Sequence, residues 1–109
     1  MSFWGIFRYR RERFLEELAG SIAAECRSAA GERVRVKAEA MSEAEARGYI
    51  RARTADLVES QTKVRSAQHR LPPPLRSRIM VLAAERVVAG VLEDIAHGEA
   101  PLVLRHWAA

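Results

Sequence analysis

Residues 79–95 read IMVLAAERVVAGVLEDI, and twelve of these seventeen residues are apolar. At about 100° per residue, the apolar side chains spread widely around a helix, whereas a surface helix needs only a stripe of about 100°. One half of the helix carries no charge, and only four charged residues interrupt the other half. The pattern predicts a central helix with neighbours on several sides, and it favours self-association of the chain. The uncharged half consists of Met80, Val81, Ala84, Val87, Val88, Val91, Leu92 and Ile95.

The composition predicts a single globular domain. The chain has 109 residues, of which 49% are hydrophobic and 29% charged, which argues against disorder of the whole chain. Residues 79–95 hold four charges and are too short for a membrane span. Cys26 is the only cysteine, and its apolar helical neighbours predict a buried, inert thiol. Because no signal-peptide pattern opens the chain, we expect a cytoplasmic protein; the arginine-rich composition without asparagine is typical of a GC-rich bacterial genome.

The first helix is expected over residues 3–30, because large apolar side chains recur there at helical spacing and Gly31 is a typical C-terminal cap. In Glu32–Lys37, valine and charge alternate with the period of a strand. This stretch is too short to stand alone, so we expect an irregular or ribbon-like connection near residues 32–41. The tail segment Leu102, Val103 and Leu104 could pair with it in a small ribbon, and an ordinary linker is the favoured alternative.

The second helix is expected over residues 43–70, and it has the clearest start signal in the chain. Ser42 and Glu45 fit a capping box, in which Glu45 would reach back to the amide of Ser42. Three consecutive prolines at 72–74 end this helix, and the third is expected over residues 75–97. A thin apolar seam is predicted along the second helix by Ile50, Leu57 and Val64, which stand seven residues apart.

The sequence contains no pattern that would carry catalysis. It has no Gly-x-Ser-x-Gly turn and no glycine-rich phosphate loop. Asp94 and His97 stand three residues apart and could share a metal, but di-iron bundles place glutamate and histidine at this spacing on two helices. A cation near a helix C-terminus explains His97 more simply. We therefore expect no enzyme activity, no catalytic residues, no cofactor and no metal site.

The N-terminal segment is the sharpest functional signal, because the first fourteen positions hold five of the seven aromatic residues, interleaved with four arginines. Such a segment could contact nucleic acid, an anionic membrane surface or another protein. The favoured alternative is that its phenylalanines belong to the core and its arginines are solvated or paired with nearby glutamates. The candidate contact residues for a partner or nucleic acid are Phe3, Trp4, Phe7, Arg8, Arg10, Arg11 and Arg13.

The charged half of residues 79–95 suggests how two copies could meet. Ala89 and Gly90 are small and lie midway between Arg86 and Glu93. If two copies crossed antiparallel at this midpoint, Arg86 of each would meet Glu93 of the other. The favoured alternative leaves both residues exposed or in contact with other helices of the same chain. The predicted oligomer interface consists of Ile79, Leu82, Ala83, Arg86, Ala89, Gly90 and Glu93.

We expect an all-α fold, a small three-helix bundle that self-associates through its central third helix. The predicted function is that of a non-catalytic helical interaction or assembly module, acting as a homodimer or higher oligomer, with another protein as a further partner. The alternative is a small basic nucleic-acid-binding regulator, in which Arg47, Arg51 and Arg53 add to the N-terminal arginines. A membrane surface is the less favoured partner. The net charge of +4 permits an acidic partner without requiring one.

Overall fold

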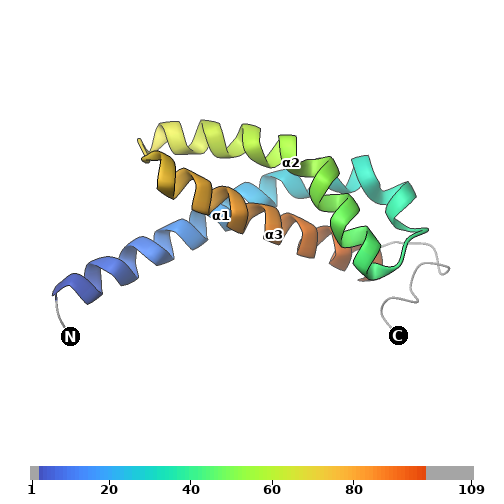
Figure 1. Ribbon diagram of the computed structural model, residues 1–109, viewed down its shortest axis with the longest axis horizontal. Helices are drawn as coiled ribbons and strands as arrows, with labels where there is room; N and C mark the ends of the chain where they lie inside the picture. Colours follow the sequence, from blue (N-terminus) through green and yellow to red (C-terminus); the bar gives the residue numbers. More distant parts are fainter. Residues whose placement is uncertain (1–2, 98–109) are drawn as a thin grey trace.

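The structure is a computed structural model that describes residues 3–97, with side chains from Gly5 onward. Three helices follow one another along the chain: α1 (Phe3–Ala38), α2 (Glu43–Gln68) and α3 (Pro73–His97). Each helix packs against both others, which confirms the predicted all-α three-helix bundle (Figure 1). The apolar tail expected at 101–109 lies outside the described residues.

Ion pairs and hydrogen bonds between the helices show how they run. Glu12 pairs with Arg78 and Arg27 pairs with Asp94, so residue numbers rise together along α1 and α3 and these two helices are parallel. Arg33 pairs with Asp56, whereas Arg65, later in α2, donates to Ser21, earlier in α1. Helix α2 therefore runs antiparallel to both neighbours, in an up-down-up arrangement.

Helix α1 is longer than the sequence predicts, because the expected connection at residues 32–41 is helical as far as Ala38. Gly31 does not end the helix, and no glycine in the described part of the chain has a positive φ. Two residues apart on a helix are about 200° apart, so Val34 enters the core while Val36 is 81% exposed. The segment in which valine and charge alternate is therefore a helix, and only one of its two valines is buried. The prediction of an irregular or ribbon-like segment was wrong.

Both ends of α2 are closed by local hydrogen bonds. Ser42 is the N-cap, and its hydroxyl accepts from the amide of Glu45 at 3.3 Å, as the capping box predicts. The Glu45 carboxylate does not reach the amide of Ser42; it accepts the Ser42 hydroxyl at 2.9 Å. At the other end, Arg70 has a φ of 53°, and the amide of Leu71 donates to the carbonyl of Ser66. This reversal turns the chain into α3 at Pro73.

The buried residues of α2 recur at every fourth position, whereas the sequence predicts an apolar seam with a spacing of seven. Val64 is 53% exposed and Leu57 is only partly buried. A row at every fourth residue turns about 40° around the helix with each step, which suits helices that cross and does not suit a left-handed coiled coil. The sequence prediction failed because the row contains hydroxyl side chains that resemble surface residues. Its members are Ala46, Ile50, Thr54, Val58, Thr62 and Ser66.

Two of these hydroxyl groups supply a test of the core. Thr62 Oγ1 and Ser66 Oγ are buried and have no hydrogen-bond partner among the described residues, whereas Thr54 Oγ1 donates to the carbonyl of Ile50 at 2.7 Å. Thr62→Val keeps the shape and removes an unsatisfied polar atom. We expect it to raise the free energy of unfolding by about 1–2 kcal/mol in urea denaturation. Thr54→Val is the control and should give no gain; equal gains from both would contradict the assignment.

The chain itself covers most of the apolar surface of α3. The buried residues of α3 include five members of the uncharged half that the sequence defines, whereas Met80 and Val81 remain 37% and 61% exposed. Helices α1 and α2 therefore cover most of the apolar surface of α3, and exposed apolar surface remains near the start of α3. The five buried members of that half are Val87, Val88, Val91, Leu92 and Ile95.

Candidate functional site

Helix α1 extends beyond its neighbours at its N-terminal end. It has 36 residues, against 26 in α2 and 25 in α3, which makes it longer by about 15 Å at 1.5 Å per residue. The last contacts mark where the neighbours end: Phe14 meets His69 just after α2, and Glu12 meets Arg78 in the first turns of α3. Figure 1 shows the N-terminal part of α1 projecting from the bundle. We call Phe3–Phe14 the arm.

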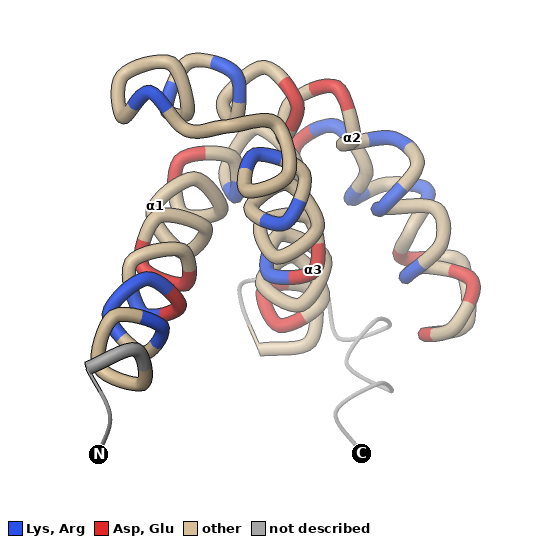
Figure 2. The backbone as a smooth tube through the Cα atoms, turned by 60° about the vertical axis from the view of Figure 1, so that its left-hand side comes forward, with Lys and Arg blue, Asp and Glu red and all other residues tan. Residues whose placement is uncertain are grey.

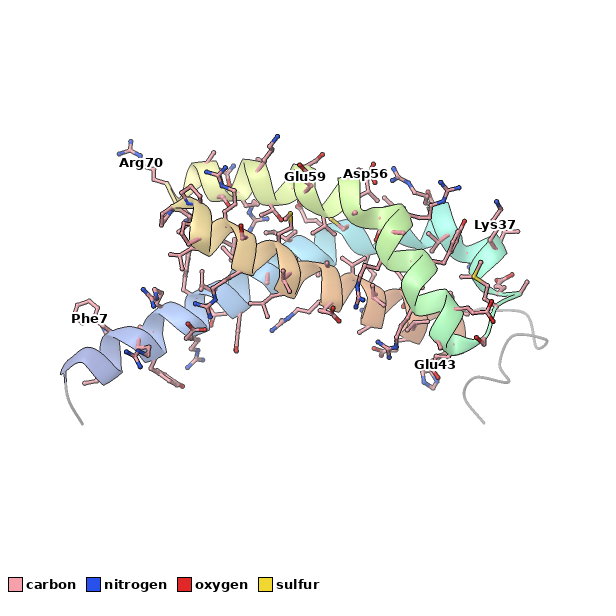
Figure 3. All side chains as sticks on the ribbon, in the orientation of Figure 1. Phe7, Lys37, Glu43, Asp56, Glu59 and Arg70 are labelled. Carbon is pink, nitrogen blue, oxygen red and sulfur yellow. The ribbon has the colours of Figure 1, made fainter. Side chains whose placement is uncertain are left out.

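The arm exposes large apolar side chains. Ile6, Phe7 and Tyr9 are 42%, 56% and 64% exposed, and Figure 3 shows Phe7 near the projecting end. Phe14 is also partly exposed, and its ring meets the His69 ring edge to face, with 5.2 Å between centroids. The favoured alternative is therefore wrong in placing Phe7 and Phe14 in the core, but its solvated or glutamate-paired arginines are observed, for example in the Arg13–Glu17 pair. The side chains of Phe3 and Trp4 lie outside the described set.

The arm also carries basic charge that is not used in ion pairs. Arg8, Arg10 and Arg11 are exposed and make no ion pair within the described residues. Arg13 pairs with Glu17 at 3.2 Å, and this hydrogen bond raises the pKa of Arg13. In Figure 2, basic residues gather near the start of α1, with acidic residues following them.

The carboxylate of Glu12 anchors the arm to α3. Its Oε2 accepts from Arg78 at 2.5 Å, and this hydrogen bond lowers the pKa of Glu12. The positive charges of Arg11 and Arg8 lower this pKa further. Glu12 therefore stays ionised at neutral pH and fixes the point from which the arm projects.

The second arginine group of the nucleic-acid hypothesis lies elsewhere. Arg47 pairs with Glu43 at 3.8 Å, Arg51 pairs with Glu85 at 2.5 Å, and the guanidinium of Arg53 lies 5.7 Å from the ring centroid of Tyr49. These residues follow the start of α2, which is at the opposite end of the bundle from the arm (Figure 1). The structure does not bring the two groups together.

The predicted oligomer interface on α3 is divided between core and surface. Ile79 and Ala83 are fully buried inside the chain, Leu82 is partly buried, and Ala89 and Glu93 are exposed. A second copy would therefore reach only part of this seam.

Two arginines cover glycines where α1 meets α3. A Cβ at Gly90 would lie 3.2 Å from Nε of Arg27, and a Cβ at Gly20 would lie 2.8 Å from a guanidinium nitrogen of Arg86. Arg27 also donates two hydrogen bonds to Asp94, at 2.8 and 2.7 Å, and the bond to Asp94 raises the pKa of Arg27. A second copy could cross at Gly90 only by displacing Arg27.

The first turns of α3 add exposed apolar surface at the same end of the bundle as the arm. Val81 and Leu82 line a shallow hollow of about 340 Å³ together with Ser77 and Arg78. The sequence placed Val81 on the half of α3 expected to be covered. It stays open because the buried row of α3 starts at Ile79 and continues through Ala83, on the other side of the helix.

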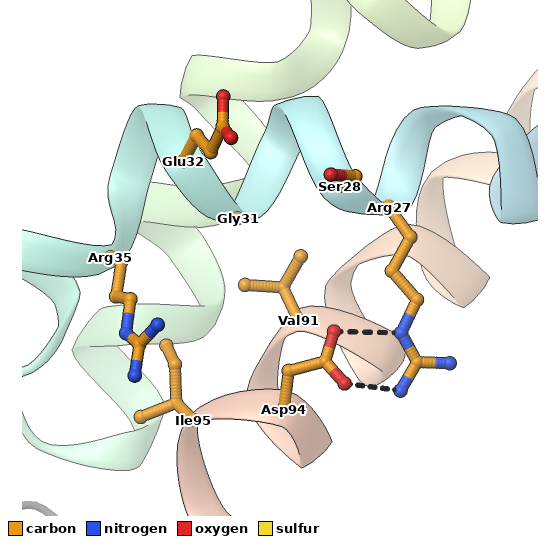
Figure 4. Close-up of a pocket in the computed structure, with 8 residues that line it drawn as sticks. All are labelled: Arg27, Ser28, Gly31, Glu32, Arg35, Val91, Asp94 and Ile95. Atoms are coloured by element: carbon orange, nitrogen blue, oxygen red, sulfur yellow. Dashed lines mark hydrogen bonds and ion pairs between the residues drawn. The ribbon is translucent and has the colours of Figure 1, made fainter. Parts of the chain in front are cut away.

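A cavity of about 340 Å³ lies between α1 and α3, over the buried side chains of Val91 and Ile95 (Figure 4). It is open beside Gly31, where a Cβ would meet nothing within 4 Å. The two arginines in its wall are already paired, Arg27 with Asp94 and Arg35 with Glu39. Neither of them is therefore available to recognise an anion there.

Neither the cysteine nor the potential metal ligands of the described residues form a reactive site. The thiol of Cys26 is buried, its Sγ donates to the carbonyl of Leu57 at 3.7 Å, and burial raises its pKa. A raised pKa keeps the thiol protonated and therefore a poor nucleophile. Between residues 3 and 97, no three histidine, cysteine, aspartate or glutamate side chains are grouped to hold a metal ion.

Comparison of the chain with protein-family models, with curated proteins and with solved structures finds no match. Of the three helices described, none is both long and apolar enough to cross a membrane.

Proposed function

We propose that this chain is a non-catalytic helical interaction module, that it self-associates, and that the arm is its contact surface. The observation that carries the proposal is a helical segment that projects from its own bundle with Ile6, Phe7 and Tyr9 exposed. Three large apolar side chains exposed within four residues of a projecting segment make this segment a candidate interaction surface. The shallow apolar hollow at the start of α3 lies at the same end and extends the available surface.

The distribution of charge supports a protein contact over a catalytic or purely electrostatic role. Several arginines form ion pairs between helices of the bundle, so their charges already have partners within the chain. The cavity between α1 and α3 has paired cations in its wall. The arm combines apolar and basic side chains, a mixture that is typical of protein interfaces, where aromatic residues and arginine are enriched.

Sedimentation equilibrium tests the proposal. From about 10 µM to 1 mM protein, we expect the mean mass to rise with concentration and to keep rising at about 500 mM salt. Phe7→Ser should reduce the association, because it removes exposed apolar area from the arm. Arg86→Glu is the control for the α3 seam and should leave association unchanged. A strictly monomeric chain across this range would contradict the proposal.

A nucleic-acid-binding regulator is the second candidate. The observation in its favour is that Arg8, Arg10 and Arg11 form no ion pair in the part of the chain that the structure describes. Three phosphate contacts would make the affinity for duplex DNA fall about 40-fold between about 50 and 200 mM salt. Fluorescence anisotropy with labelled duplex DNA measures this directly. Salt-sensitive binding that Arg10→Ala weakens would favour this candidate over self-association.

A further inference from the structure

The side of α1 that faces α2 continues along the arm without a neighbouring helix. Arg65 of α2 donates to Ser21, and His69, just after the end of α2, meets Phe14. The same side continues outward through Arg10 and Phe7, at spacings of four and three residues that keep side chains on one helix face. Within the described residues, α2 ends at Gln68 and no other helix covers this face. On this side, the arm therefore has no neighbouring helix beyond the end of α2.

The sequence of the arm is complementary to itself when two copies run antiparallel. With the two-fold axis between positions 8 and 9, position 7 of one copy lies opposite position 10 of the other, because isologous contacts are reciprocal. No arginine then stands opposite an arginine. The positions that lie at equal height are Arg8 and Tyr9, Arg10 and Phe7, and Arg11 and Ile6; of these pairs, only Phe7 and Arg10 both lie on the side of α1 that faces α2.

We propose that the arm binds the arm of a second copy of this chain, antiparallel, with Phe7 of each copy against Arg10 of its partner. A guanidinium over an aromatic ring is a favourable cation–π contact, and here it occurs twice by symmetry. Both side chains are exposed and lie on one side of α1, which permits this contact. This inference rests on the proposed function and specifies the partner and the register of the same surface.

The geometry of the bundle favours a second arm as the helix that packs on this uncovered side of the arm. The segment ahead of the contacts of Glu12 and Phe14 spans nine residues, 3–11, or about 14 Å, and a second arm is a helix of at least this length. The incoming helix would run in the direction of α2, with its N-terminus toward the C-terminal end of α2. Helix dipoles are favourable in this head-to-tail order.

The size and charge of the contact predict how strong it is. Two helices in contact over about 14 Å bury less than half of the roughly 800 Å² per partner that is typical of stable complexes, so the dimer is weak and depends on protein concentration. The arms also bring like charges near one another, because Arg8 and Arg11 flank the contact. Salt screens this repulsion, so association should strengthen from about 50 to 500 mM salt.

An exchange of the two side chains tests the register, with sedimentation equilibrium as the readout at about 300 mM salt. Phe7→Arg brings two guanidinium groups together at each contact, since the partner's Arg10 lies opposite, and should weaken dimerisation at least about tenfold. Phe7→Arg with Arg10→Phe restores an aromatic ring opposite a cation and should return the dissociation constant to within about threefold of the original. Tyr9→Arg is the charge-matched control, because position 9 lies about 160° around the helix from position 7. It should change dimerisation by less than about threefold.

The outcomes separate this inference from the proposed function. If the original chain dimerises but the exchanged variant does not recover, the antiparallel register is wrong while self-association stands. If none of the arm variants changes the dimer, the interface lies elsewhere, and the inference fails. If the chain stays monomeric at about 1 mM in all salts, both proposals fail. If the arm variants change binding to duplex DNA or to vesicles of phosphatidylserine and phosphatidylcholine but leave the mass unchanged, the occupant is not a second copy.

Discussion

Val34→Asp is expected to lower the free energy of unfolding by about 3–5 kcal/mol, the largest effect predicted for this chain. Val34 is completely buried on α1, four residues from Ala30 and from Ala38, which are also buried. The new carboxylate would be enclosed by apolar side chains without a partner, and an uncompensated buried charge costs this much. Urea denaturation followed by circular dichroism measures the loss. For a small domain this is a large part of the total stability.

Val36→Asp is the matched control for this prediction. Val36 is only two residues away in the same alternating stretch, but it is 81% exposed. On a helix, its replacement should change the free energy of unfolding by no more than about 0.5 kcal/mol. If the two substitutions had similar effects, residues 32–38 would not form a helix with Val34 on its buried side and Val36 on its exposed side.

This stretch also shows where sequence reasoning reaches its limit. Six alternating residues fit a strand of period two, and they fit a helix equally well when every fourth residue enters a core that lies elsewhere in the chain. The second interpretation requires the buried row of α2 beside it, which is a tertiary fact. Gly31 resembles a helix stop from its neighbours alone, although the structure keeps it in the helix interior beside open space.

The buried face of α2 was hidden for a related reason. Its row contains Thr54, Thr62 and Ser66, which count as polar in any hydrophobicity pattern. The evenly spaced Ile50, Leu57 and Val64 suggested a heptad, but only Ile50 is fully buried. By contrast, the capping box at Ser42 and the break at the prolines depend on local bonding, and both were located correctly.

The arm could be predicted in composition but not in position. The interleaved aromatic and basic residues drew attention to Phe7, Arg8, Arg10 and Arg11 from the sequence alone. Whether such side chains are core or surface depends on where α2 and α3 stop alongside α1. The positions at which α2 and α3 end alongside α1 depend on the length of α1. Helix α1 continues to Ala38, whereas the sequence predicts an end at residue 30, eight residues earlier.

The predicted seam on α3 can be separated from the intrachain core by Ile79→Ala. Ile79 is completely buried within one chain, so we expect this substitution to lower the free energy of unfolding by about 2–5 kcal/mol. The loss should be the same at low and high protein concentration, because a contact within one chain does not depend on association. Thermal or urea denaturation at two protein concentrations provides the measurement.

Val81→Ala is the companion variant, since Val81 lies two residues away and is 61% exposed. It should change stability by at most about 0.5 kcal/mol in dilute solution. If Ile79 belonged to an interface between copies, Ile79→Ala would leave the dilute protein nearly as stable and would mainly lower the concentration dependence of its unfolding. A loss that is independent of concentration would instead assign Ile79 to the core and leave the projecting arm as the surface best placed for self-association.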